Sequence, residues 1–111
     1  MKILWESHAW EDYVYWQFQD KKTLKKINRI ITDICRSPFE GIGKPEPLKE
    51  NLSGFWSRRI DDNGNRVVYF VKDDTVCIIA CKGHCNSLYF KIKYFKSSDL
   101  CRGIFFCPFD I

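Results

Sequence analysis

Hydrophobic positions near the N-terminus change from a short continuous run to a helical spacing. The run Ile3-Leu4-Trp5 predicts a first strand over residues 2–5. Ser7 is a suitable N-cap, and apolar side chains recur after it at intervals of three and four residues. This spacing predicts an amphipathic helix with an apolar stripe of Trp10, Tyr13, Val14 and Phe18.

A second helical pattern follows Asp20, which can cap its N-terminus. Ser37-Pro38 is expected to end this helix, because the residue before a proline is driven out of the helical region. The predicted apolar stripe consists of Leu24, Ile27, Ile31 and Ile34. The basic residues that face outward are Lys21, Lys22, Lys25, Lys26 and Arg29. That basic face indicates either an ordinary solvated surface or a contact with RNA or an acidic partner.

The second half of the chain has the alternation of strands. Residues 37–51 are rich in proline and glycine and predict a loop. Strand-like runs follow over residues 52–61, 66–71 and 75–82. One strand, two helices and an antiparallel meander predict an α+β domain, with the two helices packed on one face of a small, mainly antiparallel sheet. The other face is then available for a ligand.

A turn between the first two of these runs sets which side chains share a face. Asn63-Gly64 is typical of a two-residue type I′ hairpin. Such a turn pairs Arg59 with Val68 and places Arg59 and Arg66 on one face as diagonal neighbours.

Composition indicates one globular domain. The chain has 111 residues, 45% of them hydrophobic and 29% charged, and a net charge of +4 that suits an anionic partner such as RNA. The first apolar run ends at Glu6, too early for a signal peptide, and no apolar stretch approaches the roughly 20 residues of a membrane span. A cytoplasmic location is therefore expected, in which the 6 cysteines are free thiols rather than disulfides.

Several residues around the predicted sheet form a set that can cleave RNA without a metal ion. RNA cleavage next to a 2′-hydroxyl requires removal of a proton, neutralisation of the phosphorane charge and protonation of the 5′-oxygen. A carboxylate, arginines and a histidine supply these functions. Each residue alone is more commonly a solvated or structural side chain. The candidates are Glu46, Lys49, Arg59, Arg66 and His84.

Longer segments resemble the YoeB (Txe) branch of the RelE/ParE toxin superfamily, and the similarity extends over residues 1 to about 84. It is densest in the proline-rich loop and the strand after it. The similar segments are Lys44-Pro45-Glu46-Pro47-Leu48-Lys49, Asn51-Leu52-Ser53-Gly54-Phe55-Trp56-Ser57-Arg58-Arg59-Ile60, Arg66-Val67-Val68-Tyr69 and Ala80-Cys81 before His84.

This resemblance implies a microbial-RNase-like fold, a homodimer and no cofactor or metal. It implies binding in the ribosomal A site with cleavage of the mRNA there. It further implies inhibition by a YefM/Phd-type antitoxin, with operator DNA bound only through the antitoxin complex. Expected products are a 2′,3′-cyclic phosphate or 3′-phosphate and a 5′-hydroxyl.

The resemblance also implies roles for individual residues. Glu46 matches the general base, Arg66 the arginine that stabilises the phosphate, and His84 the general acid. The implied substrate-binding positions are Lys49, Arg59, Arg58 and Cys85.

The C-terminal part departs from the family pattern. Family members typically end in His-Tyr or within a residue or two, whereas Cys85 stands here in place of the tyrosine and residues 86–111 follow. Cysteine cannot stack on a base, and such stacking contributes about 1–3 kcal/mol per base. We therefore divide the chain into a toxin domain, 1–85, and an atypical extension, 86–111. Within the extension, the alternation over residues 88–95 suits an edge strand, and residues 103–106 form a hydrophobic run.

Three other interpretations remain open from the sequence. The protein could be a catalytically impaired toxin relic that acts only as an antitoxin-binding co-repressor. It could belong to the gyrase-poisoning ParE branch, which does not need the RNase residues. Zinc could bind Cys81, His84, Cys85, Cys101 and Cys107, although their spacing lacks the paired CxxC pattern of structural zinc sites.

Overall fold

The computed structural model describes residues 1–49, 52–83 and 104–106. In chain order the elements are β1 (Lys2–Glu6), α1 (Ser7–Gln19), α2 (Lys21–Arg36), β2 (Glu46–Pro47), β3 (Trp56–Arg59), β4 (Arg66–Lys72), β5 (Thr75–Ala80) and β6 (Ile104–Phe106). The predicted first strand, both helices and the three later strands are all present. The first strand after the loop is shorter than predicted, and β2 lies inside the segment predicted to be loop.

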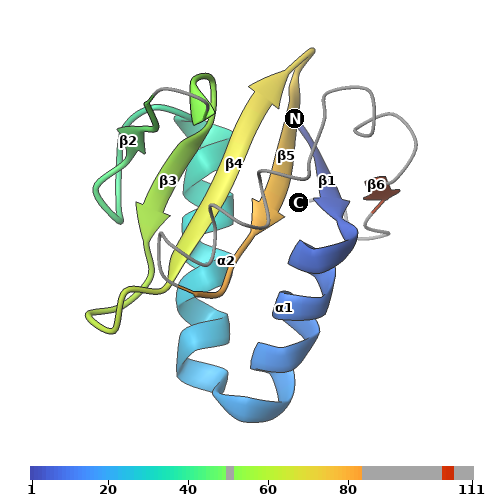
Figure 1. Ribbon diagram of the computed structural model, residues 1–111, viewed down its shortest axis with the longest axis vertical. Helices are drawn as coiled ribbons and strands as arrows, with labels where there is room; N and C mark the ends of the chain where they lie inside the picture. The colour runs from blue at the N-terminus through green and yellow to red at the C-terminus, as the bar shows by residue number, and fades with distance from the viewer. Residues whose placement is uncertain (50–51, 84–103, 107–111) are drawn as a thin grey trace.

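The strands form one sheet in the order β2-β3-β4-β5-β1-β6. Neighbouring strands are antiparallel except β1 and β5, which are parallel. Both helices lie on one side of this sheet, and α2 crosses behind β3 and β4 (Figure 1). The structure confirms the predicted α+β architecture, with two helices on one face of a mainly antiparallel sheet.

Helix α1 begins one residue earlier than predicted, at Ser7 itself. Glu6, not Ser7, is the N-cap, and its carboxylate accepts a hydrogen bond from the backbone N–H of His8 at 2.8 Å. The predicted apolar stripe was wrong at Phe18, which is 81% exposed in the last turn of the helix. Trp16 enters the core instead, and its indole N–H donates to the carbonyl of Cys81 at 2.9 Å.

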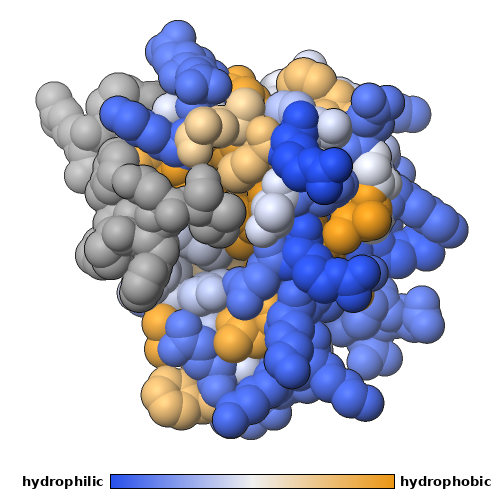
Figure 2. Space-filling view, turned by 180° about the vertical axis from the view of Figure 1, so that it is seen from behind, coloured by the Kyte–Doolittle hydropathy of each residue, from blue (hydrophilic) through white to orange (hydrophobic). Residues whose placement is uncertain are grey.

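Helix α2 follows its prediction closely. The Asp20 carboxylate accepts hydrogen bonds from the backbone N–H groups of Lys22 and Thr23, and Ser37 ends the helix. The buried apolar residues are Ile27, Ile30, Ile31 and Ile34. From behind the sheet, hydrophilic side chains cover most of the view (Figure 2), in keeping with the exposed Lys21, Lys22, Lys25 and Arg29.

The turn between β3 and β4 differs from the prediction. Asn63 does not have a positive φ, so a type I′ turn cannot form, while Gly64 has φ +94°. The longer turn is organised by Asp61, whose carboxylate accepts from the backbone N–H of Asn63 at 2.9 Å and of Asn65 at 3.1 Å. The predicted register was therefore wrong by two residues.

This register brings two arginines together. Arg59 pairs directly with Arg66, not with Val68. Because side chains alternate with a period of two, a slip of two residues leaves each side chain on its predicted face. The prediction that Arg59 and Arg66 share a face is thus confirmed.

The core lies between the helices and the sheet. It includes Ile3, Trp5, Val67, Tyr69 and Ile78 from the strands. A smaller apolar cluster is centred on Val68, Ile79 and Ala80, with Leu48, Leu52, Phe55 and Phe70 packed against it. In β4, Val68 belongs to the smaller cluster, whereas its neighbours Val67 and Tyr69 belong to the core. The smaller cluster therefore lies on the sheet face away from the helices, which we call the open face.

Strand β6 comes from the C-terminal extension. It pairs antiparallel with β1, with Trp5 opposite Phe105. The run predicted as an edge strand, residues 88–95, lies outside the described residues. Among the described residues, neither helix has the combination of length and apolar composition that a membrane span requires.

Candidate active site

Strand β2 brings Glu46 to the edge of the sheet. Glu46 pairs with Ser57 and Pro47 with Trp56 in an antiparallel arrangement. The backbone N–H of Leu48 donates to the carbonyl of Phe55 at 2.9 Å and extends this pairing. A proline in a strand is tolerated at an edge, where its missing donor leaves no ladder bond broken. Because paired residues share a face, Glu46 and Ser57 both project from the open face.

Arg66 joins these two side chains. Its Nη1 donates to Glu46 Oε1 at 2.9 Å and to Ser57 Oγ at 3.0 Å. The Arg66 side chain is 16% exposed, whereas that of Glu46 is 54% exposed. The guanidinium is therefore held in place by β2 and β3, and the carboxylate remains open to solvent.

The charge balance on this face favours an anion. Arg59 lies directly opposite Arg66, and like charges in this position repel each other. The Glu46 carboxylate offsets one of the two positive charges. Arg59 is exposed and, among the described residues, has no ion pair or side-chain hydrogen bond. Two guanidinium groups with a single carboxylate leave a positively charged cluster that matches a phosphate.

Lys49 is exposed three residues after Glu46. It lies two residues beyond the end of β2 at Pro47. Among the described residues, its side chain makes no hydrogen bond or ion pair with Glu46, Ser57 or Arg66. Lys49 is therefore close to Glu46 in the chain but is not bonded to the Glu46–Arg66–Ser57 cluster.

Arg58 does not belong to this cluster, contrary to the expectation that it binds substrate. Its side chain points to the helix side and is fully buried. The guanidinium pairs with Asp33 and donates to the carbonyls of Ser37, Glu40 and Ile42. Adjacent residues of a strand face opposite ways, so Arg58 cannot join Arg59 on the open face. It is a structural residue that ties the loop after α2 to the sheet.

His84 and Cys85 lie outside the described residues. The last residues described before them are Cys81, Lys82 and Gly83, at the end of β5. The roles expected for His84 and Cys85 therefore stay predictions.

Ser57 is a site residue that the sequence did not indicate. Its hydroxyl contacts Arg66, and the residue is 1% exposed. A signal was present, because Ser57 lies two residues before Arg59 and so projects from the same face. A lone serine in a strand carries no distinct motif, however, and its contact depends on the correct register.

The cysteines of the described ranges do not form a metal site. Within those ranges no group of three or more His, Cys, Asp or Glu residues could hold a metal ion. Burial raises the pKa of the Cys77 thiol to about 11, which disfavours the thiolate that metals and electrophiles require. Of the proposed zinc ligands, only Cys81 is described, so the zinc alternative is untested.

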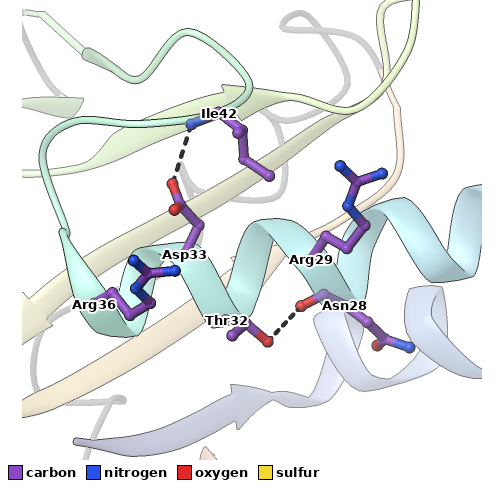
Figure 3. A pocket seen from close by; sticks show the side chains of 6 residues that line it. All are labelled: Asn28, Arg29, Thr32, Asp33, Arg36 and Ile42. Atoms are coloured by element: carbon purple, nitrogen blue, oxygen red, sulfur yellow. Dashed lines mark hydrogen bonds between the residues drawn. The ribbon is translucent and has the colours of Figure 1, made fainter.

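A pocket lies on the helix side of the molecule. Asn28, Arg29, Thr32, Asp33 and Arg36 of α2 line it together with Ile42 from the following loop (Figure 3). Asp33 accepts a hydrogen bond from the backbone N–H of Ile42 at 3.0 Å and also pairs with Arg58. The pocket is separated by the sheet from Glu46 and Arg66 and contributes nothing to their cluster.

Comparison with known proteins connects this geometry to a family. A family model described as "YoeB-like toxin of bacterial type II toxin-antitoxin system" matches residues 5–85. Toxin YoeB of Escherichia coli O6:H1 (strain CFT073) is 60% identical over 84 residues, which cover 76% of this chain and 99% of that protein.

Two solved structures from Staphylococcus aureus are also similar. The YoeB dimer has a TM-score of 0.71 at 48% identity, and the match covers 76% of this chain and 97% of that one. The heterotetrameric YoeB-YefM toxin-antitoxin complex has a TM-score of 0.70 at 48% identity, with the same coverage of 76% and 97%.

Proposed function

Because this chain belongs to the YoeB-like toxin family of bacterial type II toxin-antitoxin systems, we propose that it is a metal-independent endoribonuclease that cleaves mRNA on the ribosome. A YefM/Phd-type antitoxin would neutralise it, and the active protein would be a cytoplasmic homodimer. The observation that carries the proposal is the Glu46–Arg66–Ser57 cluster on the open face of the sheet.

In the proposed reaction Glu46 acts as the general base. Its exposed carboxylate takes the proton of the 2′-hydroxyl, and the resulting oxygen attacks the adjacent phosphorus. The bond from phosphorus to the 5′-oxygen then breaks. The expected products are a 2′,3′-cyclic phosphate and a 5′-hydroxyl.

Arg66 stabilises the charge that develops on the phosphorane. Its guanidinium is oriented by the Ser57 hydroxyl and is largely buried before substrate arrives, so it needs little reorganisation at the moment of reaction. An exposed ion pair contributes only about 0–1 kcal/mol, so a phosphate can compete with Glu46 for the arginine at small cost. Such a displacement would free the Glu46 carboxylate to accept a proton.

The remaining roles concern the leaving group and the backbone. His84 is proposed to protonate the 5′-oxygen as general acid. Arg59 and Lys49 are proposed to hold neighbouring phosphates, because both are exposed cations, Arg59 opposite Arg66 in the sheet and Lys49 three residues after Glu46. Cys85 would occupy the place where family members present a tyrosine to the reacting nucleotide.

The proposal is tested by expressing the full chain in a bacterial host with and without a YefM-type partner. The 5′ ends of mRNA are then mapped by primer extension. Cuts inside translated codons that disappear when the partner is present are expected. Intact mRNA and normal growth, with folded protein present, would contradict the RNase proposal. An effect on DNA replication instead of translation would favour the gyrase-poisoning alternative.

One feature favours a second candidate function, a relic that only binds the antitoxin and acts as co-repressor. Cys85 replaces the stacking tyrosine, and the extension after it contributes β6 to the sheet. The same expression experiment discriminates, since a relic would bind the partner without cutting mRNA.

Replacing Ser57 with alanine is expected to slow cleavage about ten- to a hundredfold, because a hydrogen bond to a charged group is worth about 1.5–3 kcal/mol. The variant removes one of the two side-chain contacts that orient Arg66. Single-turnover cleavage in purified ribosome complexes measures the effect. Ser53→Ala is the matched control, because Ser53 is an exposed serine of the preceding turn. Equal rates for the two variants would show that Ser57 does not support Arg66.

A further inference from the structure

The three residues before His84 are held from two sides of the molecule. On one side, helix α1 holds Cys81. Its backbone N–H donates to Asp12 Oδ2 at 3.2 Å, and its carbonyl accepts from the indole N–H of Trp16 at 2.9 Å. Asp12 and Trp16 are both buried, so the end of β5 is fixed against α1.

On the other side, the turn between β3 and β4 holds Gly83. The backbone N–H of Gly83 donates to Asn65 Oδ1 at 2.8 Å. Gly83 has φ +103°, a backbone conformation that residues other than glycine rarely adopt. The chain therefore turns at Gly83 in a way that glycine permits and that the Asn65 hydrogen bond fixes.

Asn65 is itself oriented by a neighbour. Its Nδ2 donates to Asp61 Oδ2 at 2.8 Å, and its backbone N–H donates to Asp61 Oδ1 at 3.1 Å. This arrangement leaves Oδ1 of Asn65 directed at the Gly83 N–H. The carboxamide thus uses a donor and its acceptor in one defined orientation.

The contact between Asn65 and Gly83 joins two residues that are each next in the chain to a proposed catalytic residue. Asn65 directly precedes Arg66, and Gly83 directly precedes His84. A single side chain therefore connects the start of the strand that carries Arg66 to the backbone from which His84 follows. A displacement of about 1 Å at a reacting group can cost roughly a hundredfold in rate.

We propose that Asn65 is a positioning residue for the proposed general acid: it holds the Gly83 backbone, from which His84 follows in the chain, beside the start of β4. The proposal rests on the proposed RNase function and adds a residue to it. Asn65 does not touch the substrate, and its effect on protonation of the 5′-oxygen passes through the Gly83 backbone.

The test uses the full chain in ribosome complexes programmed with a short mRNA, whose scissile 5′-oxygen is either natural or replaced by sulfur. A thiolate leaves without protonation, so the sulfur substrate does not need a general acid. Asn65→Ala is expected to slow cleavage of the oxygen substrate about ten- to a hundredfold and to slow the sulfur substrate far less. His84→Ala should give the same pattern. A purely structural defect would slow both substrates alike.

Asn63→Ala is the matched control, since Asn63 is an exposed asparagine of the same turn that contacts Asp61 through its backbone N–H. It should cleave both substrates like the unaltered protein. Thermal unfolding and antitoxin binding check that the variants fold. Should Asn65→Ala fold poorly, Asp61→Asn is the second variant, because it weakens the anchor of Asn65 and should give a smaller defect of the same kind.

The outcomes separate the two proposals. If the unaltered protein cuts and Asn65→Ala matches Asn63→Ala, or slows both substrates equally, the positioning role is overturned and the RNase function stands. If the unaltered protein cuts neither substrate on the ribosome, the proposed function fails, and this role fails with it.

Discussion

Replacement of Arg66 by alanine is expected to slow mRNA cleavage by about 10²- to 10³-fold, the usual cost of removing one donor that stabilises a transition-state charge. The guanidinium is the group that binds both Glu46 and Ser57, so its loss also leaves Glu46, the proposed general base, without its cationic neighbour. Antitoxin binding should be largely retained, because the substitution leaves the core unchanged. Single-turnover cleavage and a pull-down with the antitoxin measure these two properties.

Lysine at this position should recover only part of the rate. It keeps the positive charge but lacks the planar fork with which arginine can bind two oxygens. Arg36→Ala is a matched control, because Arg36 is an exposed arginine on the helix side of the sheet. Full activity of Arg66→Ala, or a similar loss in Arg36→Ala, would contradict the role of Arg66.

Replacement of Asp33 by alanine is expected to lower the free energy of unfolding by about 3–5 kcal/mol, the typical cost of leaving one member of a buried ion pair without its partner. Arg58 is fully buried, and Asp33 is its carboxylate partner. For a domain of this size the melting temperature should fall by about 12 °C or more. Calorimetry or circular dichroism measures the change.

Two comparisons test this explanation. Asp33→Asn keeps the size and an acceptor for Arg58 and should cost less, whereas Asp62→Ala in the exposed turn should change the stability by about 0.5 kcal/mol or less. A loss of similar size in Asp62→Ala would mean that the Asp33–Arg58 pair has no special effect.

The Asp33–Arg58 pair should also make the free energy of unfolding depend on pH. The hydrogen bond from Arg58 holds the pKa of Asp33 below its usual value. A carboxylate whose pKa is lowered by folding stabilises the native state above its unfolded pKa, and that contribution disappears as the pH falls through its folded pKa. Acid should therefore destabilise the unaltered protein more than Asp33→Asn, and equal acid sensitivity would contradict this assignment.

The elements of the fold could be predicted because local signals mark them. Asp20 caps α2, and Pro38 follows its end, as predicted. The hairpin register could not be predicted, because Asn63-Gly64 matches a common turn while the Asp61 side chain stabilises a longer one. The local sequence is compatible with both turns and does not show which of them is more stable.

The site residues also divide into those that could be predicted from the sequence and those that could not. Glu46 and Arg66 were expected from their chemistry and the family resemblance, and the structure brings them into contact. Ser57 and Arg58 were misjudged because neighbouring strand residues face opposite sides, and only the fold shows which side is buried. The position of Asn65 beside Gly83 joins residues far apart in the chain, which no local pattern indicates.

The parallel pairing of β1 with β5 has a consequence for synthesis. Ile3 pairs with Val76 and Trp5 with Ile78. Strand β1, which leaves the ribosome first, therefore cannot pair until β5 has also been synthesised. Contacts between such distant residues form slowly, because the intervening chain loses entropy before the contact stabilises it. The sheet therefore closes only after most of the polypeptide has been made. Under the proposed function, the nascent chain therefore lacks its complete sheet for most of the time that the ribosome is making it.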